Sequence, residues 1–197
     1  MMRIIRRSQF ETFAWKNGAG VTHEAIRVPP GAERYLWRLS VADVAASGPF
    51  SDFTGYRRHL VLLQGDGLRL RFSGGGGAEL RQPGDLAEFD GSLRTDCDLA
   101  GGACIDMNLL TARSIATVDA RVERLAAPLI LRCGSDETVV LACVRGSIAI
   151  DGTGQEPAAL GPWDVAVHER RAAAVELRCT PGPSGGELLF IARFVES

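Results

Sequence analysis

Two turns recur along this chain at one fixed offset. The apolar segments HLVLLQGDGLRL and TVVLACVRGSIA turn at Gly67 and at Gly146, which lie 79 positions apart. Downstream, a Pro-x-Asp turn stands at 83–85 and again at 162–164, at the same offset. Strands and turns that keep one register without an insertion indicate two copies of one β module. The repeat therefore predicts a duplicated barrel.

The remaining sequence also favours short strands joined by turns. The chain has 23 glycines and few helix signals. In the segment 35–44 (YLWRLSVADV) apolar and polar residues alternate with period two, which predicts a strand. LVLLQ and LRLRF flank the turn at 65–67 and are predicted to pair as a hairpin. The glycine-rich run 73–77 (SGGGG) is expected to be a second, flexible hairpin tip, and 113–128 either a connector or a strand. The predicted fold class is all-β with little helix.

Composition limits the function classes. With 197 residues, 46% of them apolar and 23% charged, the chain can form one large β domain or two of about 100 residues. A net charge of −2 argues against a nucleic-acid partner. No stretch reaches the roughly 18 apolar residues of a membrane helix. The start MMRIIRRSQFE lacks the apolar core of a secretory signal, so we expect a cytoplasmic protein.

The cysteines do not suggest a reactive site. There are five, at 97, 104, 133, 143 and 179, and no two form a C-x-x-C pair. Without a secretion signal they are predicted to be reduced, buried, small apolar residues. A nucleophilic cysteine would need a neighbouring base, and the sequence assigns none.

Residues capable of specific chemistry gather in the first half of the chain. The stretches WKNG (15–18), WRLS (37–40), GPFSDFTGYR (48–57, followed by Arg58) and DMN (106–108) occur in this order. Together they resemble the HutD/Ves family, bacterial bicupins associated with histidine utilisation. The resemblance runs from about residue 13 to 110. The chain departs from the family at Ala19 and His23, where glycine and arginine are common.

The resemblance implies a fold and a kind of function. It implies a duplicated double-stranded β-helix, that is, a bicupin with RmlC-like jelly-roll barrels. Residues 1–112 would form an N-terminal cupin module with the ligand pocket, and 113–197 a structural C-terminal module. The pocket would bind a small carboxylated metabolite of histidine degradation, similar to formylglutamate or urocanate, without a metal or other cofactor and in a regulatory role. Exposed strand edges are compatible with a homodimer.

The histidine content argues against a metal centre. Metal-binding cupins carry a His-x-His motif, a downstream Glu and a further His, all pointing into the barrel. This chain has only His23, His59 and His168, and no two of them stand in one module at ligand spacing. Each is expected to be partly exposed or hydrogen-bonded. A metalloenzyme such as a dioxygenase is therefore disfavoured.

The polar cluster suits an anion with polar substituents. By alternation, Arg38 and Ser40 share one strand face, and Arg38 would project into the barrel if the apolar face packs outward. There it could form a bidentate pair with a carboxylate, while Asp106 either contacts the ligand or orients Arg38. Phe50 and Phe53 are expected to line or cover the pocket mouth. The candidate ligand-binding residues are Lys16, Asn17, Thr22, Glu24, Arg38, Ser40, Ser51, Arg58, Asp106 and Asn108.

Two alternatives stay open. A buried Arg–Asp pair with Ser and Asn neighbours could serve structure alone. The chain could also be a metal-independent cupin enzyme, isomerase- or hydrolase-like, that uses His59 with Asp106 or Glu24 as acid and base. Against the enzyme, His59 should face away from Arg58 on a strand. We expect a binding protein rather than an enzyme.

Overall fold

The computed structural model describes residues 2–15, 18, 20–152, 154, 156–169 and 173–195, with the side chains at 117 and 118 excepted. The chain divides into two compact units. The N-terminal unit comprises Phe10–Arg113, and the C-terminal unit combines Met1–Gln9 with Ser114–Ser197. The regular elements of the described residues are strands, apart from one short 3-10 helix, η1 (Arg7–Gln9).

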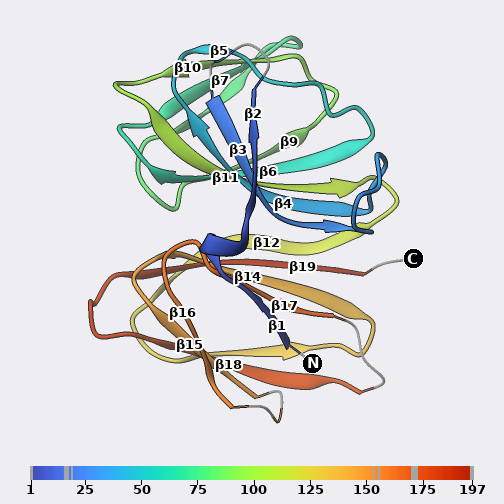
Figure 1. The fold of residues 1–197 in the computed structure, drawn as a ribbon, viewed down its shortest axis with the longest axis vertical. Helices are drawn as coiled ribbons and strands as arrows, with labels where there is room; N and C mark the ends of the chain where they lie inside the picture. Colours follow the sequence, from blue (N-terminus) through green and yellow to red (C-terminus); the bar gives the residue numbers. More distant parts are fainter. Residues whose placement is uncertain are drawn as a thin grey trace. The chain divides into compact units, whose positions relative to one another are not determined.

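The N-terminal unit consists of two antiparallel sheets (Figure 1). The larger sheet has the order β2 (Glu11–Ala14), β3 (Gly20–Val28), β4 (Trp37–Val44), β11 (Cys104–Ala112), β6 (Tyr56–Gln64) and β9 (Leu86–Asp90). The smaller sheet has the order β5 (Gly48–Pro49), β10 (Thr95–Leu99), β7 (Leu68–Phe72) and β8 (Gly77–Leu80).

The C-terminal unit repeats this topology. Its larger sheet has the order β1 (Met2–Ile5), β17 (Val165–His168), β14 (Glu137–Arg145), β19 (Glu187–Val195) and β12 (Ala116–Leu125). Its smaller sheet has the order β13 (Leu129–Cys133), β18 (Val175–Pro181), β15 (Ile148–Asp151) and β16 (Ala158–Leu160). Thus β4-β11-β6-β9 corresponds to β12-β19-β14-β17, and the small sheets correspond strand for strand. The predicted all-β, duplicated fold is confirmed.

The repeated turns have similar backbone conformations but do not make the predicted hairpin. Gly67 and Gly146 both have positive φ, at 110° and 83°. However, β6 is already paired on both sides, with β9 and β11, so β7 cannot add to it and lies in the smaller sheet. The Gly67 turn therefore carries the chain from one sheet to the other. The hairpin tip predicted at 73–77 is confirmed, because Arg71 of β7 pairs with Gly77 of β8.

The boundary region contains a strand, and the start of the chain joins the C-terminal unit. Residues 116–125 form β12, which settles the choice between connector and strand. Residues 1–9, assigned above to the N-terminal module, instead supply β1, which pairs with β17. Beyond β1, the Arg6 guanidinium contacts the Asp164 carboxylate at 2.8 Å, and the Arg7 backbone N–H donates to the same carboxylate.

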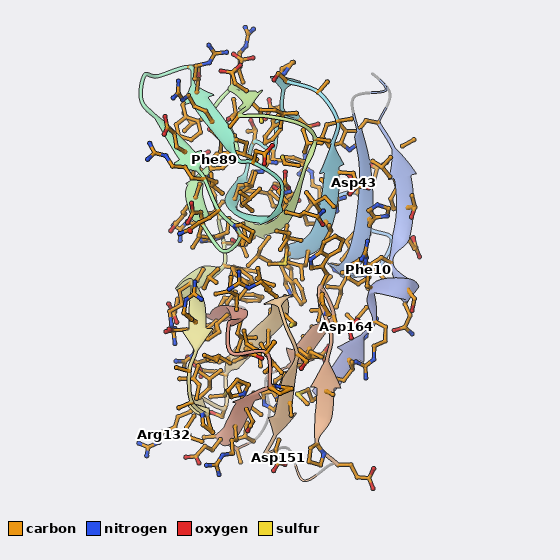
Figure 2. All side chains as sticks on the ribbon, turned by 90° about the vertical axis from the view of Figure 1, so that its left-hand side faces the viewer. Phe10, Asp43, Phe89, Arg132, Asp151 and Asp164 are labelled. Atoms are coloured by element: carbon orange, nitrogen blue, oxygen red, sulfur yellow. The ribbon has the colours of Figure 1, made fainter. Side chains whose placement is uncertain are left out.

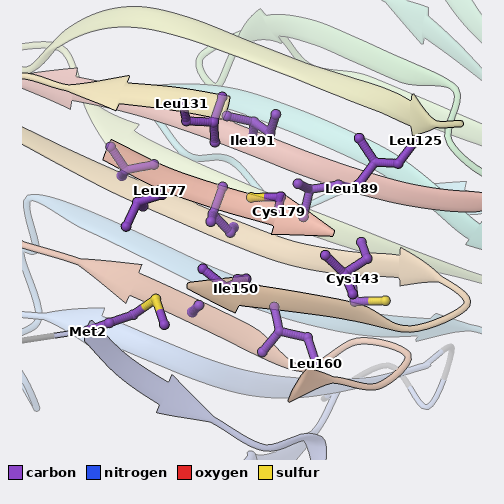
Figure 3. Close-up of a cluster of buried hydrophobic side chains, with 14 of the residues drawn as sticks. Met2, Leu125, Leu131, Cys143, Ile150, Leu160, Leu177, Cys179, Leu189 and Ile191 are labelled. Atoms are coloured by element: carbon purple, nitrogen blue, oxygen red, sulfur yellow. The ribbon is translucent and has the colours of Figure 1, made fainter. Parts of the chain in front are cut away.

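The interior of the C-terminal unit is apolar. Its core includes Val139, Leu141, Leu189 and Ile191, each no more than 1% exposed. Leu189 and Ile191 are labelled in the close-up of this cluster in Figure 3. Charged side chains such as Arg132 and Asp151 project outward (Figure 2). The five cysteines are free and buried, as predicted. Burial raises the pKa of their thiols, to about 11 for Cys133 and to about 12 for the others.

Candidate functional site

A pocket of about 480 Å³ opens in the N-terminal unit. Strands β3, β4, β6 and β11 of the larger sheet provide its polar side chains, and the segment 49–53 contributes aromatic ones. The lining residues are Ala14, Trp15, Thr22, Arg38, Ser40, Ala42, Pro49, Phe50, Ser51, Phe53, Arg58, Asp106, Asn108 and Leu110.

Strand register explains why distant residues meet in this pocket. Glu24 of β3 lies opposite Ser40 of β4, and Ser40 lies opposite Asn108 of β11. The adjacent row places Arg38, Leu110 and Arg58 side by side. Residues in register on neighbouring strands point to the same face of the sheet. The alternation in 35–44 thus predicted the inward face of β4 correctly.

One side of the site is an acid held between two arginines. The Arg38 Nε donates to Glu24 Oε2 at 2.6 Å, and Arg27 binds the same carboxylate through Nε and Nη2 at 3.0 and 2.6 Å. Burial opposes ionisation of Glu24, but the hydrogen bonds and charges of both arginines prevail and lower its pKa. Glu24 therefore stays ionised and orients Arg38.

The other side is a hydrogen-bonded relay of buried groups. Arg58 Nε donates to Asn108 Oδ1 at 2.7 Å, and Asn108 Nδ2 donates to Asp106 Oδ1. Burial lowers the pKa of Arg58 to about 10, although the Asp106 charge opposes this. Burial raises the pKa of Asp106 to about 7, against the lowering effects of the Arg58 charge and the Asn108 hydrogen bond. The second Asp106 oxygen, Oδ2, is buried and has no hydrogen-bond partner in the described chain.

Aromatic rings surround the Arg58 cation. Its guanidinium carbon lies 4.6 Å from the ring centroid of Phe50 and 5.4 Å from those of Phe53 and Phe89. Such rings attract a cation and exclude water from it. The guanidinium keeps both Nη atoms free of hydrogen-bond partners among the described residues.

Most of the predicted ligand-binding residues converge on the pocket. Seven line it: Thr22, Arg38, Ser40, Ser51, Arg58, Asp106 and Asn108. Glu24 stands behind Arg38 instead of lining the cavity. Asp106 contacts Asn108 and does not orient Arg38, since Glu24 does so. Lys16 and Asn17 lie outside the described residues.

Sequence reasoning missed Arg27 and the small wall residues. A β-bulge between Glu24 and Ile26 turns Arg27 toward Glu24, and strict alternation would have placed it on the opposite face. Ala42 follows Ser40 on the inward face of β4, so alternation could have identified it. Ala14 and Pro49 lack any such signal. The Trp15 Nε1–H donates to Thr22 Oγ1 at 2.8 Å, which fixes this ring in the wall.

The histidines lie away from the pocket chemistry. His59 pairs with Leu109 and Glu88 on the other face of β6, so the proposed pairing with Asp106 or Glu24 is wrong. His59 is 1% exposed, and neither ring nitrogen has a hydrogen-bond partner in the described chain. Its Nε2 lies 3.6 Å from Glu88 Oε2, which is too far for a hydrogen bond.

The other two histidines differ from each other. His168 is also buried, with Nδ1 unpartnered among the described residues. His23 fits the expectation of a partly exposed or hydrogen-bonded ring: it contacts Thr12 at 3.0 Å and Asp43 at 3.1 Å. Within the described ranges, no three His, Cys, Asp or Glu side chains are grouped to hold a metal ion. No described helix has the length and hydropathy to cross a membrane.

The C-terminal unit carries apolar residues where the pocket has its relay. Arg58 lies opposite Phe89, and Val139 lies opposite His168, the residue 79 positions after Phe89. By the same register, Ile191 and Leu189 of β19 occupy the positions of Asn108 and Asp106. The corresponding relay positions are therefore filled by the apolar core.

The fold and the pocket together define a class, the bicupin. Oxalate decarboxylase from Lactobacillus farciminis has the same fold, with a TM-score of 0.66 at 8% identity over 98% of this chain and 86% of that one.

The chain belongs to the HutD family, whose model matches residues 7–184. A Pseudomonas putida relative, described as an uncharacterized 21.2 kDa protein in the hutC 3' region, is 35% identical over 83% of this chain and 84% of its own length. A conserved protein of unknown function from Pseudomonas aeruginosa, PA5104, superposes over both whole chains with a TM-score of 0.90 at 31% identity. HutD from Pseudomonas fluorescens, solved in a formate condition, gives 0.81 at 27% over both whole chains.

Proposed function

We propose that this chain is a metal-free binding protein whose N-terminal pocket takes a small carboxylated metabolite of histidine degradation, in a regulatory role. The observation that carries the proposal is the charge balance of the site. Arg27, Arg38 and Arg58 stand against Glu24 and Asp106, so the site has an excess of positive charge even with both acids ionised. An excess of guanidinium groups, of which Arg58 is buried and Arg27 and Arg38 are partly exposed, favours an anion that can accept paired hydrogen bonds.

The pocket walls suit a compact ligand with an apolar or planar part. Trp15, Phe50, Phe53 and Leu110 line a cavity of about 480 Å³, within the range of small-molecule sites. The context of the relatives supports the metabolite class, since one is named by the hutC region and another is HutD. The formate condition of the latter structure involves the smallest carboxylate.

Binding can be tested by thermal shift and calorimetry with urocanate and N-formylglutamate. We expect apparent stability to rise with ligand concentration, because a ligand that binds the folded state stabilises it by mass action. The methyl ester of urocanate, which lacks the carboxylate, should bind at least about tenfold more weakly, since removing a charge-assisted contact is worth about 1.5–3 kcal/mol.

Arg38→Gln should weaken binding by about tenfold or more, because Arg38 lines the pocket. Arg27→Gln is the matched control, since Arg27 binds the same Glu24 carboxylate without lining the cavity. A response to Arg38→Gln no larger than that to Arg27→Gln would remove Arg38 as the anion anchor. A flat response to every carboxylate would contradict the proposed function, and stoichiometric Fe, Mn or Zn in the purified protein would contradict its metal-free part.

A further inference from the structure

We infer that Asp106 makes the pocket selective for carboxylates that also present an N–H or O–H donor, which the ligand gives to Asp106 Oδ2. This inference rests on the proposed function and specifies its ligand. Asp106 Oδ2 is a buried acceptor that receives no hydrogen bond from the described residues.

The first observation is an unmatched acceptor in the pocket wall. Asp106 is 1% exposed and lines the cavity. Its Oδ1 accepts from Asn108, whereas Oδ2 has no hydrogen-bond partner among the residues that the structure describes. Among the described pocket-lining residues, Oδ2 is the only fully buried side-chain oxygen or nitrogen in this condition. Buried polar atoms are normally hydrogen-bonded, so an exception at a cavity wall indicates where a ligand contributes the missing partner.

The second observation is that the neighbouring described donors are directed elsewhere. Asn108 Nδ2 donates to Oδ1, Arg58 Nε donates to Asn108 Oδ1, and neither Arg58 Nη atom makes a hydrogen bond to Oδ2. Oδ2 is already shielded from solvent, so it stays unpaired unless a bound ligand brings a donor to it. A site built to hydrogen-bond a substrate N–H or O–H discriminates strongly against an analogue that lacks it. A carboxylate without a donor would also bring a second unpaired acceptor next to the first.

The variant Asp106→Asn should replace the hydrogen-bond acceptor at the Oδ2 position with a donor. Asn108 Nδ2 needs an acceptor, so it holds the side-chain oxygen of the new amide in the place of Oδ1. The amide NH₂ then takes the place of Oδ2 and turns an acceptor into a donor of nearly the same size. The substitution should therefore reverse the donor preference without enlarging the pocket.

Matched ligand pairs test the inference. The planar pair is 3-(pyrrol-2-yl)acrylate, which has a ring N–H, and 3-(furan-2-yl)acrylate, which has an oxygen at that position. The open-chain pair is N-formylglutamate and 2-(formyloxy)glutarate, in which an ester oxygen replaces the N–H. Affinities are measured by calorimetry at pH 8, where Asp106, with a pKa raised to about 7, is mostly ionised.

We expect the wild-type protein to bind the N–H member of a pair at least tenfold more tightly, and Asp106→Asn to abolish or reverse that preference. Equal affinities for both members in the wild type would overturn the inference while leaving the carboxylate pocket intact. A preference that persists in a folded Asp106→Asn protein would also overturn it. If no member of either pair binds, the proposed function itself fails. The wild-type comparison decides even if the variant does not fold.

Discussion

At the scale of single residues, two buried charged side chains of the pocket are connected through the side chain of an asparagine. Arg58 and Asp106 are both buried, yet they meet through Asn108 and not directly. An amide can donate to the acid and accept from the cation at once, which satisfies one atom of each. The arrangement leaves the remaining polar atoms of both groups available, whereas a direct bidentate pair would consume them.

His59 gives a residue-scale prediction about acid stability. Burial lowers the pKa of its imidazole in the folded state below the ordinary value of 6.5, with Glu88 opposing the shift. The unfolded chain therefore takes up the proton first, and the folded state loses stability as the pH falls below 6.5. In His59→Leu this loss disappears. Relative to the variant, the wild type should lose up to ~1.4 kcal/mol per pH unit while one proton is taken up.

Urea unfolding of both proteins between pH 7 and 5 measures the difference. Asp106 has the opposite sign, because its folded-state pKa is raised and it stabilises the fold as the pH falls. It is present in both proteins and cancels in the comparison. His23→Gln, at a partly exposed position, serves as the control. Parallel pH curves for wild type and His59→Leu would contradict the prediction.

At the scale of elements, the sequence predicted the inward face of a strand and the positions of turns better than it predicted which strands pair. Alternation in 35–44 placed Arg38 and Ser40 on one face, and β4 has that geometry. The bulge between Glu24 and Ile26 was not predicted, because no residue type in this segment marks the position where the strand register shifts. The hairpin prediction at Gly67 failed because partner choice depends on β9 and β11, which are distant in sequence. Local pattern encodes orientation, while pairing is a long-range property.

The sheet-crossing turn at Gly67 should not tolerate a side chain. Its φ of 110° lies in the region that L residues avoid, at about 1–2 kcal/mol, and a Cβ would lie 2.5 Å from the Leu80 backbone oxygen. We expect Gly67→Ala to lower the free energy of unfolding by at least about 2 kcal/mol. Gly74→Ala is the control, because its Cβ would meet nothing within 4 Å. Equal urea midpoints for the two variants would contradict this account.

At the scale of the whole molecule, duplication preserved topology while the interiors diverged. The turns that define the 79-residue offset recur in both units, so the repeat was readable from sequence. The relay positions differ completely, with Val139, Leu189 and Ile191 in the C-terminal unit. Even the turn changed its residue: Trp163 has a φ of 70° where the N-terminal copy has Gly84. The ring packs against the Arg7 guanidinium at 3.8 Å, a contact that offsets the backbone strain.

Removal of residues 2–9 from the chain of 197 residues should destabilise the C-terminal unit selectively. Met2 and Ile5 are buried there, β1 covers one edge of β17, and Arg6 pairs with Asp164. Hydrogen exchange should show faster exchange at 165–168, where β17 loses its β1 partner, and unchanged protection in β4 and β11. Arg3→Ala, at an exposed position of the same strand, is the control. Unaltered exchange in β17 would show that β1 contributes no stability.

The pairing of β1 with β17 also determines when during synthesis the larger sheet of the C-terminal unit can be completed. Strand β1 has its hydrogen-bonding partner far along the chain, because Met2 pairs with His168 and Ile5 pairs with Val165. All of Phe10–Arg113, a compact unit with its own strands, is made in between. During translation, β1 therefore stays without its partner until β17 has been made. The C-terminal unit can complete its larger sheet only with a segment that was synthesised before the whole N-terminal unit.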